Sequence, residues 1–273
     1  MKIYICADME GASGVVHTDQ TTSDRPEYAF GCRMQLHDVN AVVEGLVEAG
    51  VKDILVNDAH ARMINLDIAA LHPAARLLSG TPKTGNMVEG HEGFDAALFV
   101  GFHAMAGTRH AILDHTVSSA VVYSVTVNGH ELGETGLNAM ACSASGVPTA
   151  LVTGDQAACD EASRLLGPEL VTLPVKTARG RLAADCLPPA VTAPLLRAAA
   201  VRAVEQTRAQ RAPFLNFKGP FDLRLTFHTC AQCDQAAIVP TVERLDGRTL
   251  RVTAEGGAEA ARWATALIRL ASR

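Results

Sequence analysis

Two carboxylates stand directly after the first apolar segment of this chain. Asp8 and Glu10 follow the run 2–7, whose composition predicts a β-strand. A nucleotide-binding fold would place a glycine-rich phosphate loop here, whereas two carboxylates repel phosphate and attract a cation. In extended chain these two side chains point to the same side, because one residue separates them. Taken alone, the pair is also explained by a turn or helix cap plus a surface glutamate.

Histidines follow the next two predicted strands. His60 comes shortly after the strand 53–57, and His103 directly follows the almost wholly apolar strand 96–102. The Asp58 carboxylate shares a strand face with His60 and could orient its second ring nitrogen. A single buried histidine is more often a hydrogen-bonded structural residue, so neither position is decisive by itself.

The repetition along the chain favours a site over coincidence. In an open α/β sheet the carboxyl ends of the parallel strands meet at one edge, where ligands bind. A glutamate near the start of the helix predicted over 135–145 adds a further candidate, and spacing alone does not choose between Glu131 and Glu134. The side chains expected together are therefore Asp8, Glu10, His60, His103 and one of these glutamates.

Mixed carboxylate and imidazole ligands suit zinc, and less commonly manganese or iron. Five ligands exceed what one tetrahedral zinc needs. They suit two metal ions about 3.5–4 Å apart that share a bridging carboxylate. Three carboxylates and one bridging hydroxide would neutralise two dications, and that hydroxide would be the nucleophile of a hydrolase.

The elements that must position these residues alternate between strand and helix over the first half of the chain. Helical patterns cover 26–50, 135–145 and 155–167, between apolar runs at 2–7, 53–57, 96–102 and 149–153. This alternation predicts an α/β fold with a mostly parallel sheet flanked by helices.

The pattern changes in the second half. A β-rich stretch at 116–127 precedes the turn dipeptide Asn128-Gly129, and 178–211 is Ala- and Arg-rich and reads as mostly helical. A strand at 222–227, a hairpin around Asp246-Gly247 and a helix at 258–270 complete the tail. We therefore predict a catalytic α/β region over 1–177 and a smaller α+β region over 178–273.

Composition excludes several classes of protein. The net charge of −5 and the 4% of aromatic residues give neither the basic footprint nor the stacking surface of a nucleic-acid-binding protein. No apolar stretch reaches the length of a membrane helix, and the acidic Asp8 interrupts what would be a signal peptide. Seven scattered cysteines do not form a disulfide framework, so we expect a reduced, cytoplasmic protein.

Four ordered motifs resemble those of the zinc-dependent D-aminopeptidases linked to dipeptide transport. The similarity extends over most of the chain and is sharpest in residues 1–155. The motifs are Asp8-x-Glu10-Gly11, Asn57-Asp-x-His60, Gly101-aromatic-His103 and Gly133-Glu134-x-Gly136-Leu137-Asn138-Ala139.

The resemblance implies two zinc ions per chain. It implies that Asp8 bridges them, that Glu10 and His103 complete one site, and that His60 and Glu134 complete the other. The motif around Glu134 favours that residue over Glu131. Other divalent metals are compatible with the same ligands.

The resemblance also implies an activity and an assembly. The family's additional histidine matches His115, which we expect to shuttle protons or stabilise the oxyanion. The family forms a ring-like decamer around its active sites, so we expect a homo-oligomer. Its substrates are short peptides with an N-terminal D-residue, D-Ala-D-Ala among them.

Two other functions remain open at this stage. One is a two-metal amidohydrolase or L-aminopeptidase, because stereochemistry depends on pocket shape. The other is a metal-dependent peptide-binding protein without turnover.

Three cysteines could take part in metal chemistry. Cys6 stands where the family usually has serine, and we expect it to pack in the core. Cys230 and Cys233 have the spacing of a redox or zinc motif, but a single pair more often reflects an ordinary helix start.

Overall fold

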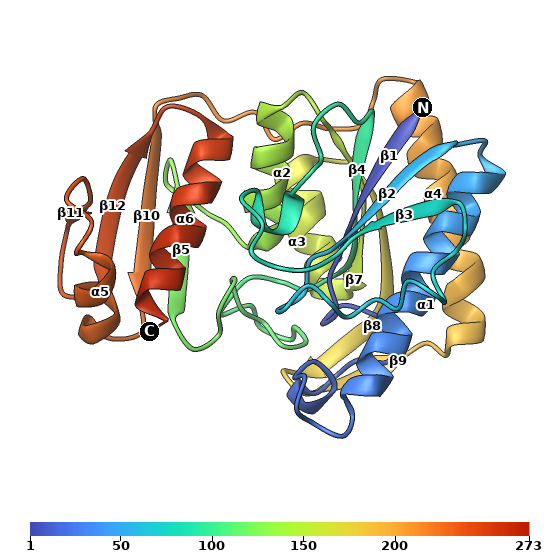
Figure 1. Ribbon diagram of the computed structural model, residues 1–273, viewed down its shortest axis with the longest axis horizontal. Coiled ribbons are helices and arrows are strands. Elements are labelled where there is room, and N and C mark those ends of the chain that lie inside the picture. Colours follow the sequence, from blue (N-terminus) through green and yellow to red (C-terminus); the bar gives the residue numbers. More distant parts are fainter. Residues whose placement is uncertain (273) are drawn as a thin grey trace.

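The computed structural model describes residues 1–272, which form two β-sheets with helices on and between them (Figure 1). Sheet A has the spatial order β3-β2-β1-β4-β7-β8-β9. All neighbouring strands in it are parallel except the last pair, β8 and β9. The strands are β1 (Lys2–Ala7), β2 (Asp53–Asp58), β3 (Ala75–Leu78), β4 (Ala96–Phe102), β7 (Thr149–Asp155), β8 (Val171–Gly180) and β9 (Ala183–Cys186).

Sheet B is antiparallel and has the order β11-β12-β10-β5-β6. It combines two strands from the middle of the chain with three from the end. These strands are β5 (Val122–Val127), β6 (His130–Glu131), β10 (Phe221–Phe227), β11 (Glu243–Arg244) and β12 (Thr249–Ala254). Asn128-Gly129, both at positive φ, form the predicted tight turn between β5 and β6.

The helices form layers around sheet A. Figure 1 shows α1 and α4 on one face, and α2 and α3 on the face toward sheet B. Helix α6 packs on both sheet B and α2, and so joins the two sheets. The helices are α1 (Tyr28–Glu48), α2 (Glu134–Ala144), α3 (Gln156–Leu166), α4 (Pro189–Arg208), α5 (Cys230–Ala236) and α6 (Gly257–Ala271), with short 3-10 helices η1 (Thr18–Gln20) and η2 (Asn86–Val88).

Successive side chains of β1 point to opposite faces of sheet A, so this strand contributes apolar residues to the core on both sides. Ile3 and Ile5 pack with α1 and α4, whereas Tyr4 and Cys6 point to the other face. That second cluster continues without a break into α6 and sheet B. Strand β4 is buried along its whole length, as its apolar composition predicts for the centre of a parallel sheet.

The expected fold class is confirmed, but two local predictions are wrong. The Ala-rich start of 178–211 is not helical: β8 extends to Gly180 and turns back into β9. Pairing with the edge of sheet A outweighs alanine's helix propensity there. Residues 116–121 form a loop, so the strand expected from 116 begins only at Val122.

The predicted division at residue 177 does not coincide with a change of sheet. Strand β8 runs through this position, and α4 packs on α1 of the N-terminal region. Within residues 1–272, no helix combines the length and apolar character needed to cross a membrane.

Candidate metal centre

The ends of β1 and β4 approach each other closely. The Asp8 amide donates to the Val100 carbonyl at 2.8 Å, and the Gly11 amide donates to the Gly101 carbonyl at 2.8 Å. A Cβ atom on Gly101 would lie 2.5 Å from the Asp8 carbonyl oxygen, and the φ of Gly101 is +75°. Glycine is therefore required where the two strand ends bring their side chains together.

A buried lysine holds the loop that carries Glu10. Lys176, on β8, donates from Nζ to the carbonyls of Glu10 and Ala12, each at 2.7 Å, and to that of Val15. Burial lowers the pKa of Lys176 to about 8. The ammonium group thus satisfies three carbonyls that the sharp turn after β1 would otherwise leave without partners.

His60 faces the two carboxylates of the β1 loop. Its Nδ1 lies 3.2 Å from Asp8 Oδ1 and 3.0 Å from Glu10 Oε2. Its Nε2 lies 2.8 Å from the Thr21 carbonyl, which as an acceptor assigns the proton to Nε2. The Asp58 carboxylate accepts instead from Asn65, so a backbone carbonyl, not Asp58, orients the second nitrogen of His60.

His103 and Glu134 face Asp8 from the other side. The Nε2 of His103 lies 3.5 Å from Asp8 Oδ2 and 3.3 Å from Glu134 Oε1. The Nδ1 of His103 donates to the Ala104 carbonyl at 3.0 Å. Glu134 begins α2, where the helix dipole favours a carboxylate. Glu131 is exposed in β6, so Glu134 is the glutamate at this site.

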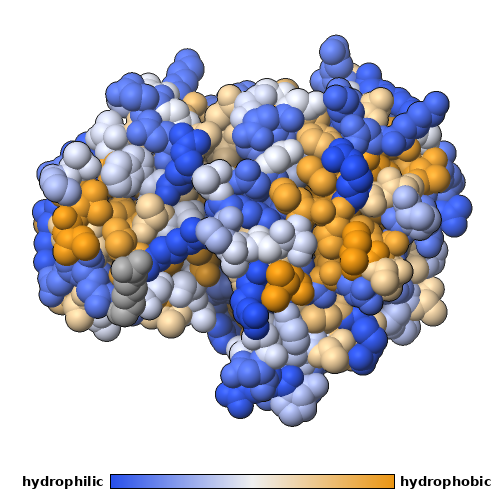
Figure 2. Space-filling view, in the orientation of Figure 1, coloured by the Kyte–Doolittle hydropathy of each residue, from blue (hydrophilic) through white to orange (hydrophobic). Residues whose placement is uncertain are grey.

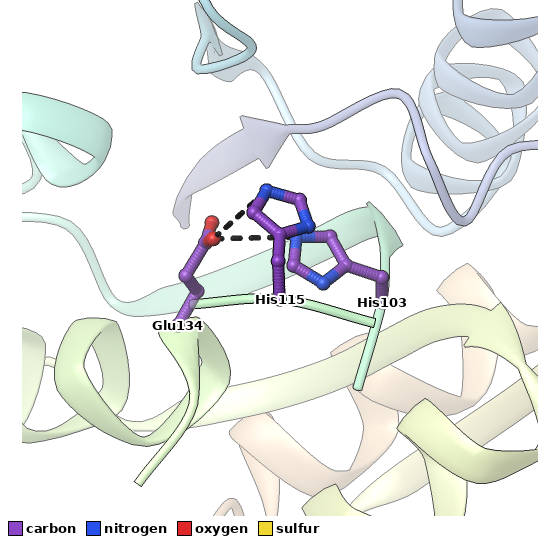
Figure 3. Close-up of side chains that lie close together, drawn as sticks. All are labelled: His103, His115 and Glu134. Carbon is purple, nitrogen blue, oxygen red and sulfur yellow. Dashed lines mark ion pairs between the residues drawn. The ribbon is translucent and has the colours of Figure 1, made fainter. Parts of the chain in front are cut away.

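His115 stacks on His103 at the edge of the cluster (Figure 3). The two rings are 4.0 Å apart between centroids and 10° from parallel. The Nδ1 of His115 donates to the Leu113 carbonyl at 2.8 Å, and its Nε2 lies 3.6 Å from Glu134 Oε1. The His115 side chain keeps 17% of its surface exposed, against 1% for His103, so it can reach a bound molecule.

The loop around His115 has unusual backbone angles. Leu113 and Val117 have φ values of +51° and +63°, which β-branched and bulky residues rarely adopt. The Val117 amide donates to Glu134 Oε1 at 2.6 Å, and the Asp114 carboxylate accepts from Arg181 Nε at 2.9 Å. These contacts hold the loop in its strained shape beside the cluster.

The protein groups shift one another's pKa values strongly. Burial and the neighbouring Glu10 raise the pKa of Asp8 to about 7. Burial acts in the opposite sense on His60 and His103, but the facing carboxylates raise both pKa values well above the usual range. Burial and the neighbouring His103 lower the pKa of His115. His115 is therefore neutral near pH 7.

Unpaired buried atoms indicate where a cation fits. Asp8 Oδ2, Glu10 Oε2 and His103 Nε2 are buried and have no hydrogen-bond partner within residues 1–272. Asp8, Glu10 and His103 offer ligand atoms within 4.8 Å of one another, and so do His103, His115 and Glu134. Buried polar groups without partners are costly, and a cation among these ligand types would satisfy them. The residues therefore fit a metal centre.

A cavity of about 560 Å³ opens beside the cluster. Its wall includes Asp8, Glu10, His60, His115 and Glu134, together with residues of α6. This volume lies in the range of small-molecule sites. On the face shown in Figure 2, mainly hydrophilic side chains lie between the two sheets.

Comparisons with known proteins agree with this geometry. The model of peptidase family M55, described as D-aminopeptidase, matches residues 1–266. This chain belongs to that family. The M55 chain is 34% identical over 250 residues to a D-aminopeptidase of Bacillus subtilis (strain 168), which corresponds to 91% of this chain and 89% of the relative.

The M55 chain is also similar to a solved structure, that of the Zn-dependent D-aminopeptidase DppA from Bacillus subtilis, described as a self-compartmentalizing protease. The TM-score is 0.95 and the identity 32%, covering 100% of this chain and 98% of that chain. Family membership confirms the predicted family, peptidase class and α/β fold. The roles of the individual residues stay predictions.

The sequence analysis did not predict the residues that hold the loops and side chains of the candidate metal centre in place. Lys176, Thr21 and Arg181 lie far along the chain from the residues they hold. A local signal was a single lysine inside the otherwise uncharged stretch 171–178, which is unusual in a buried strand unless the charge has partners.

The cysteines with possible metal chemistry lie outside the centre. The buried Cys6 thiol donates to the Met87 carbonyl at 3.0 Å, and burial raises its pKa well above the usual range. Cys230 and Cys233 form the first turn of α5. None of the three belongs to a metal-holding group within residues 1–272.

Proposed function

We propose that this M55 chain is a zinc-dependent aminopeptidase that releases the N-terminal D-residue from short peptides such as D-Ala-D-Ala. The observation that carries this proposal is the cluster of buried ligand atoms without hydrogen-bond partners, on Asp8, Glu10 and His103, beside a cavity whose wall includes Asp8 and Glu10. The related DppA is a Zn-dependent D-aminopeptidase, which supports zinc as the metal and D-peptides as substrates.

Two zinc ions are the proposed complement, held by Asp8, Glu10, His60, His103 and Glu134. When bound, they would supply a bridging hydroxide as nucleophile and Lewis acidity toward the scissile carbonyl. Asp8 is the proposed bridge because its two oxygens face different imidazoles: Oδ1 lies near His60 and Oδ2 near His103.

The hydrogen bonds of the imidazoles suit ligand roles. His60 and His103 each donate one ring N–H to a backbone carbonyl and turn the other nitrogen toward the carboxylates. In the neutral, metal-binding form of each ring, this arrangement would direct a lone pair at the metal position and fix the ring.

His115 is the proposed proton carrier. Its Nδ1 is committed to the Leu113 carbonyl, so in the neutral ring the free lone pair is on Nε2, on the side of Glu134. Its lowered pKa keeps that nitrogen unprotonated near neutral pH and able to accept a proton. It could then deliver the proton to the leaving amine.

We also propose that the chain works as a homo-oligomer, because the related DppA is described as self-compartmentalizing. A decamer is the expected size from the family resemblance. The seven cysteines are all unpaired, which is in keeping with a reducing cytoplasm.

The test compares stereoisomers on the zinc-loaded protein. D-Ala-D-Ala and L-Ala-L-Ala are incubated separately and free alanine is quantified, with chelator-treated protein as the control. Release from the D,D-peptide alone supports the proposal. Release from the L,L-peptide would keep a metallopeptidase but overturn the D-specificity, and release from neither would overturn peptidase activity on dialanine.

A further inference from the structure

The charges of the cavity wall are unevenly distributed. Its acidic residues are Asp8, Glu10 and Glu134, all of them in the proposed metal centre. Its arginines are Arg181 and Arg269. A short peptide in water carries a positive amino end and a negative carboxyl end, so one cavity offers groups of opposite charge for the two ends.

Arg269 belongs to the last turns of α6, in the part of the molecule that carries sheet B. It donates through a terminal nitrogen to Asn86 Oδ1 at 3.3 Å, and Asn86 Nδ2 donates to Thr265 Oγ1 at 3.2 Å. Thr265 and Arg269 are one helical turn apart and both line the cavity. The Asn86 side chain thus links η2 to α6 and contacts the guanidinium of Arg269 at the cavity wall.

The two arginines differ in their partners. Arg181 forms an ion pair with Asp114 at 2.9 Å and a further contact with the Asp114 carbonyl, so its charge is compensated inside the protein. Arg269 has no acidic side chain within 4.0 Å in the described part of the chain, residues 1–272. Its recorded polar partner is the neutral amide of Asn86. It therefore keeps donors and a full charge for an anionic group.

We infer that Arg269 binds the C-terminal carboxylate of the substrate and that the substrates are short peptides with a free carboxyl end. This inference rests on the proposed function, because it assumes that the scissile bond lies at the metal centre in the same cavity. A guanidinium recognises a carboxylate through charge-assisted, often bidentate hydrogen bonds. In a dipeptide the carboxylate lies two bonds from the scissile nitrogen but takes no part in the bond cleavage, so we expect the interaction to support binding more than the chemical step.

The test uses two substrates and matched variants. Steady-state kinetics are measured with D-Ala-D-Ala and with D-Ala-D-alaninamide, which differs only in its uncharged carboxyl end. The variants are Arg269→Met, Arg181→Met and, as a control, Arg262→Met. Arg262 is also exposed and lies two turns earlier on α6; it lines a smaller neighbouring cavity of about 60 Å³, which also includes Glu134, and not the 560 Å³ cavity that holds Arg269.

We expect the wild type to favour the free acid by about tenfold or more in kcat/KM, the size of a hydrogen bond to a charged group. Arg269→Met should remove that preference by raising the KM for the acid, with kcat within about twofold. Zinc content and the kinetics of the amide should stay unchanged. Arg262→Met should behave like the wild type.

A second readout needs no turnover. A D-Ala-D-Ala analogue with a reduced, non-hydrolysable peptide bond should bind the zinc-loaded wild type about tenfold more tightly than its C-terminal amide. In Arg269→Met, calorimetry should show similar affinities for the two.

Some outcomes would overturn the inference. Equal kcat/KM values of the wild type for the acid and the amide would contradict the existence of a subsite for the carboxylate. A preference that survives in Arg269→Met but disappears in Arg181→Met would move it to Arg181. Failure of the proposed function is distinguishable, because the wild type would then hydrolyse neither compound.

Discussion

At the scale of single residues, the centre is defined by which atoms have partners. His60 and His103 use one ring nitrogen to bind a carbonyl and leave the other facing carboxylates. His115 has the same pattern but is more exposed and stacks on His103. This difference separates a proposed proton carrier from the proposed ligands.

Replacing His115 with alanine should lower kcat for D-Ala-D-Ala by about 100-fold or more, because the proton transfer would lose its positioned group. Zinc content should stay near two per chain by atomic absorption. His110→Ala is the control, because His110 is exposed in the same loop and does not line the cavity. Loss of zinc from His115→Ala would instead make His115 a ligand.

Glu134→Gln should lower the zinc content toward one ion per chain, because an amide is a much weaker zinc ligand than a carboxylate. Glu131→Gln is the matched control, since that side chain is exposed in β6. Both variants are assayed for zinc and for thermal unfolding. Equal zinc contents in the two would contradict the assignment of Glu134.

At the scale of elements, the centre depends on how strand ends are held together. β1 and β4 meet through Gly11 and Gly101, and β8 contributes Lys176 beneath the loop after β1. The loop therefore gets its shape from a strand more than 160 positions away in sequence.

Lys176→Met should free the carbonyls of Glu10, Ala12 and Val15 and loosen the loop that presents Glu10. We expect unfolding free energy to fall by about 2 kcal/mol or more, because buried carbonyls lose their partners. Zinc affinity, measured by competition with a chelating dye, should fall as well. Lys52→Met, at an exposed position, should change neither. Stability loss with normal zinc affinity would limit Lys176 to a structural role.

At the scale of the whole molecule, one cavity is built by both sheets' helices and loops. The candidate metal centre lies at the edge of sheet A, and residues of α6, which packs on sheet B, line the same cavity. Three carboxylates are buried on this wall, so the folded state gains from a cation that the unfolded chain binds weakly.

Removing metal should therefore destabilise the whole fold. With zinc at about 100 times its dissociation constant the stabilisation is about 2.7 kcal/mol, which corresponds to a Tm change of about 5–10 °C for a chain of this size. Differential scanning calorimetry with and without chelator measures this, and added zinc should restore the Tm. An unchanged Tm would show that the buried carboxylates do not hold a metal.

The sequence by itself determined the alternation of strands and helices in the first half and the candidate ligands at the strand ends. Hydrophobic periodicity is a local property, so it can be recognised in the sequence without a structure. The carboxyl ends of parallel strands meet at one edge of the sheet, so residues that follow these strands, such as Asp8, His60 and His103, could be predicted to lie together. The helix predicted at the start of 178–211 was wrong for residues 178–186, because pairing with the edge of sheet A outweighs the local helix propensity there.

Only the tertiary structure decided how these residues are supported and what closes the site. It showed that the Thr21 carbonyl orients His60 and that Lys176 lies under the loop after β1. It also left Glu131 exposed, in agreement with the motif that already favoured Glu134. It also brought Arg269 to the cavity. These contacts join residues distant in sequence, and their energies depend on distance, burial and direction, which spacing along a chain does not specify.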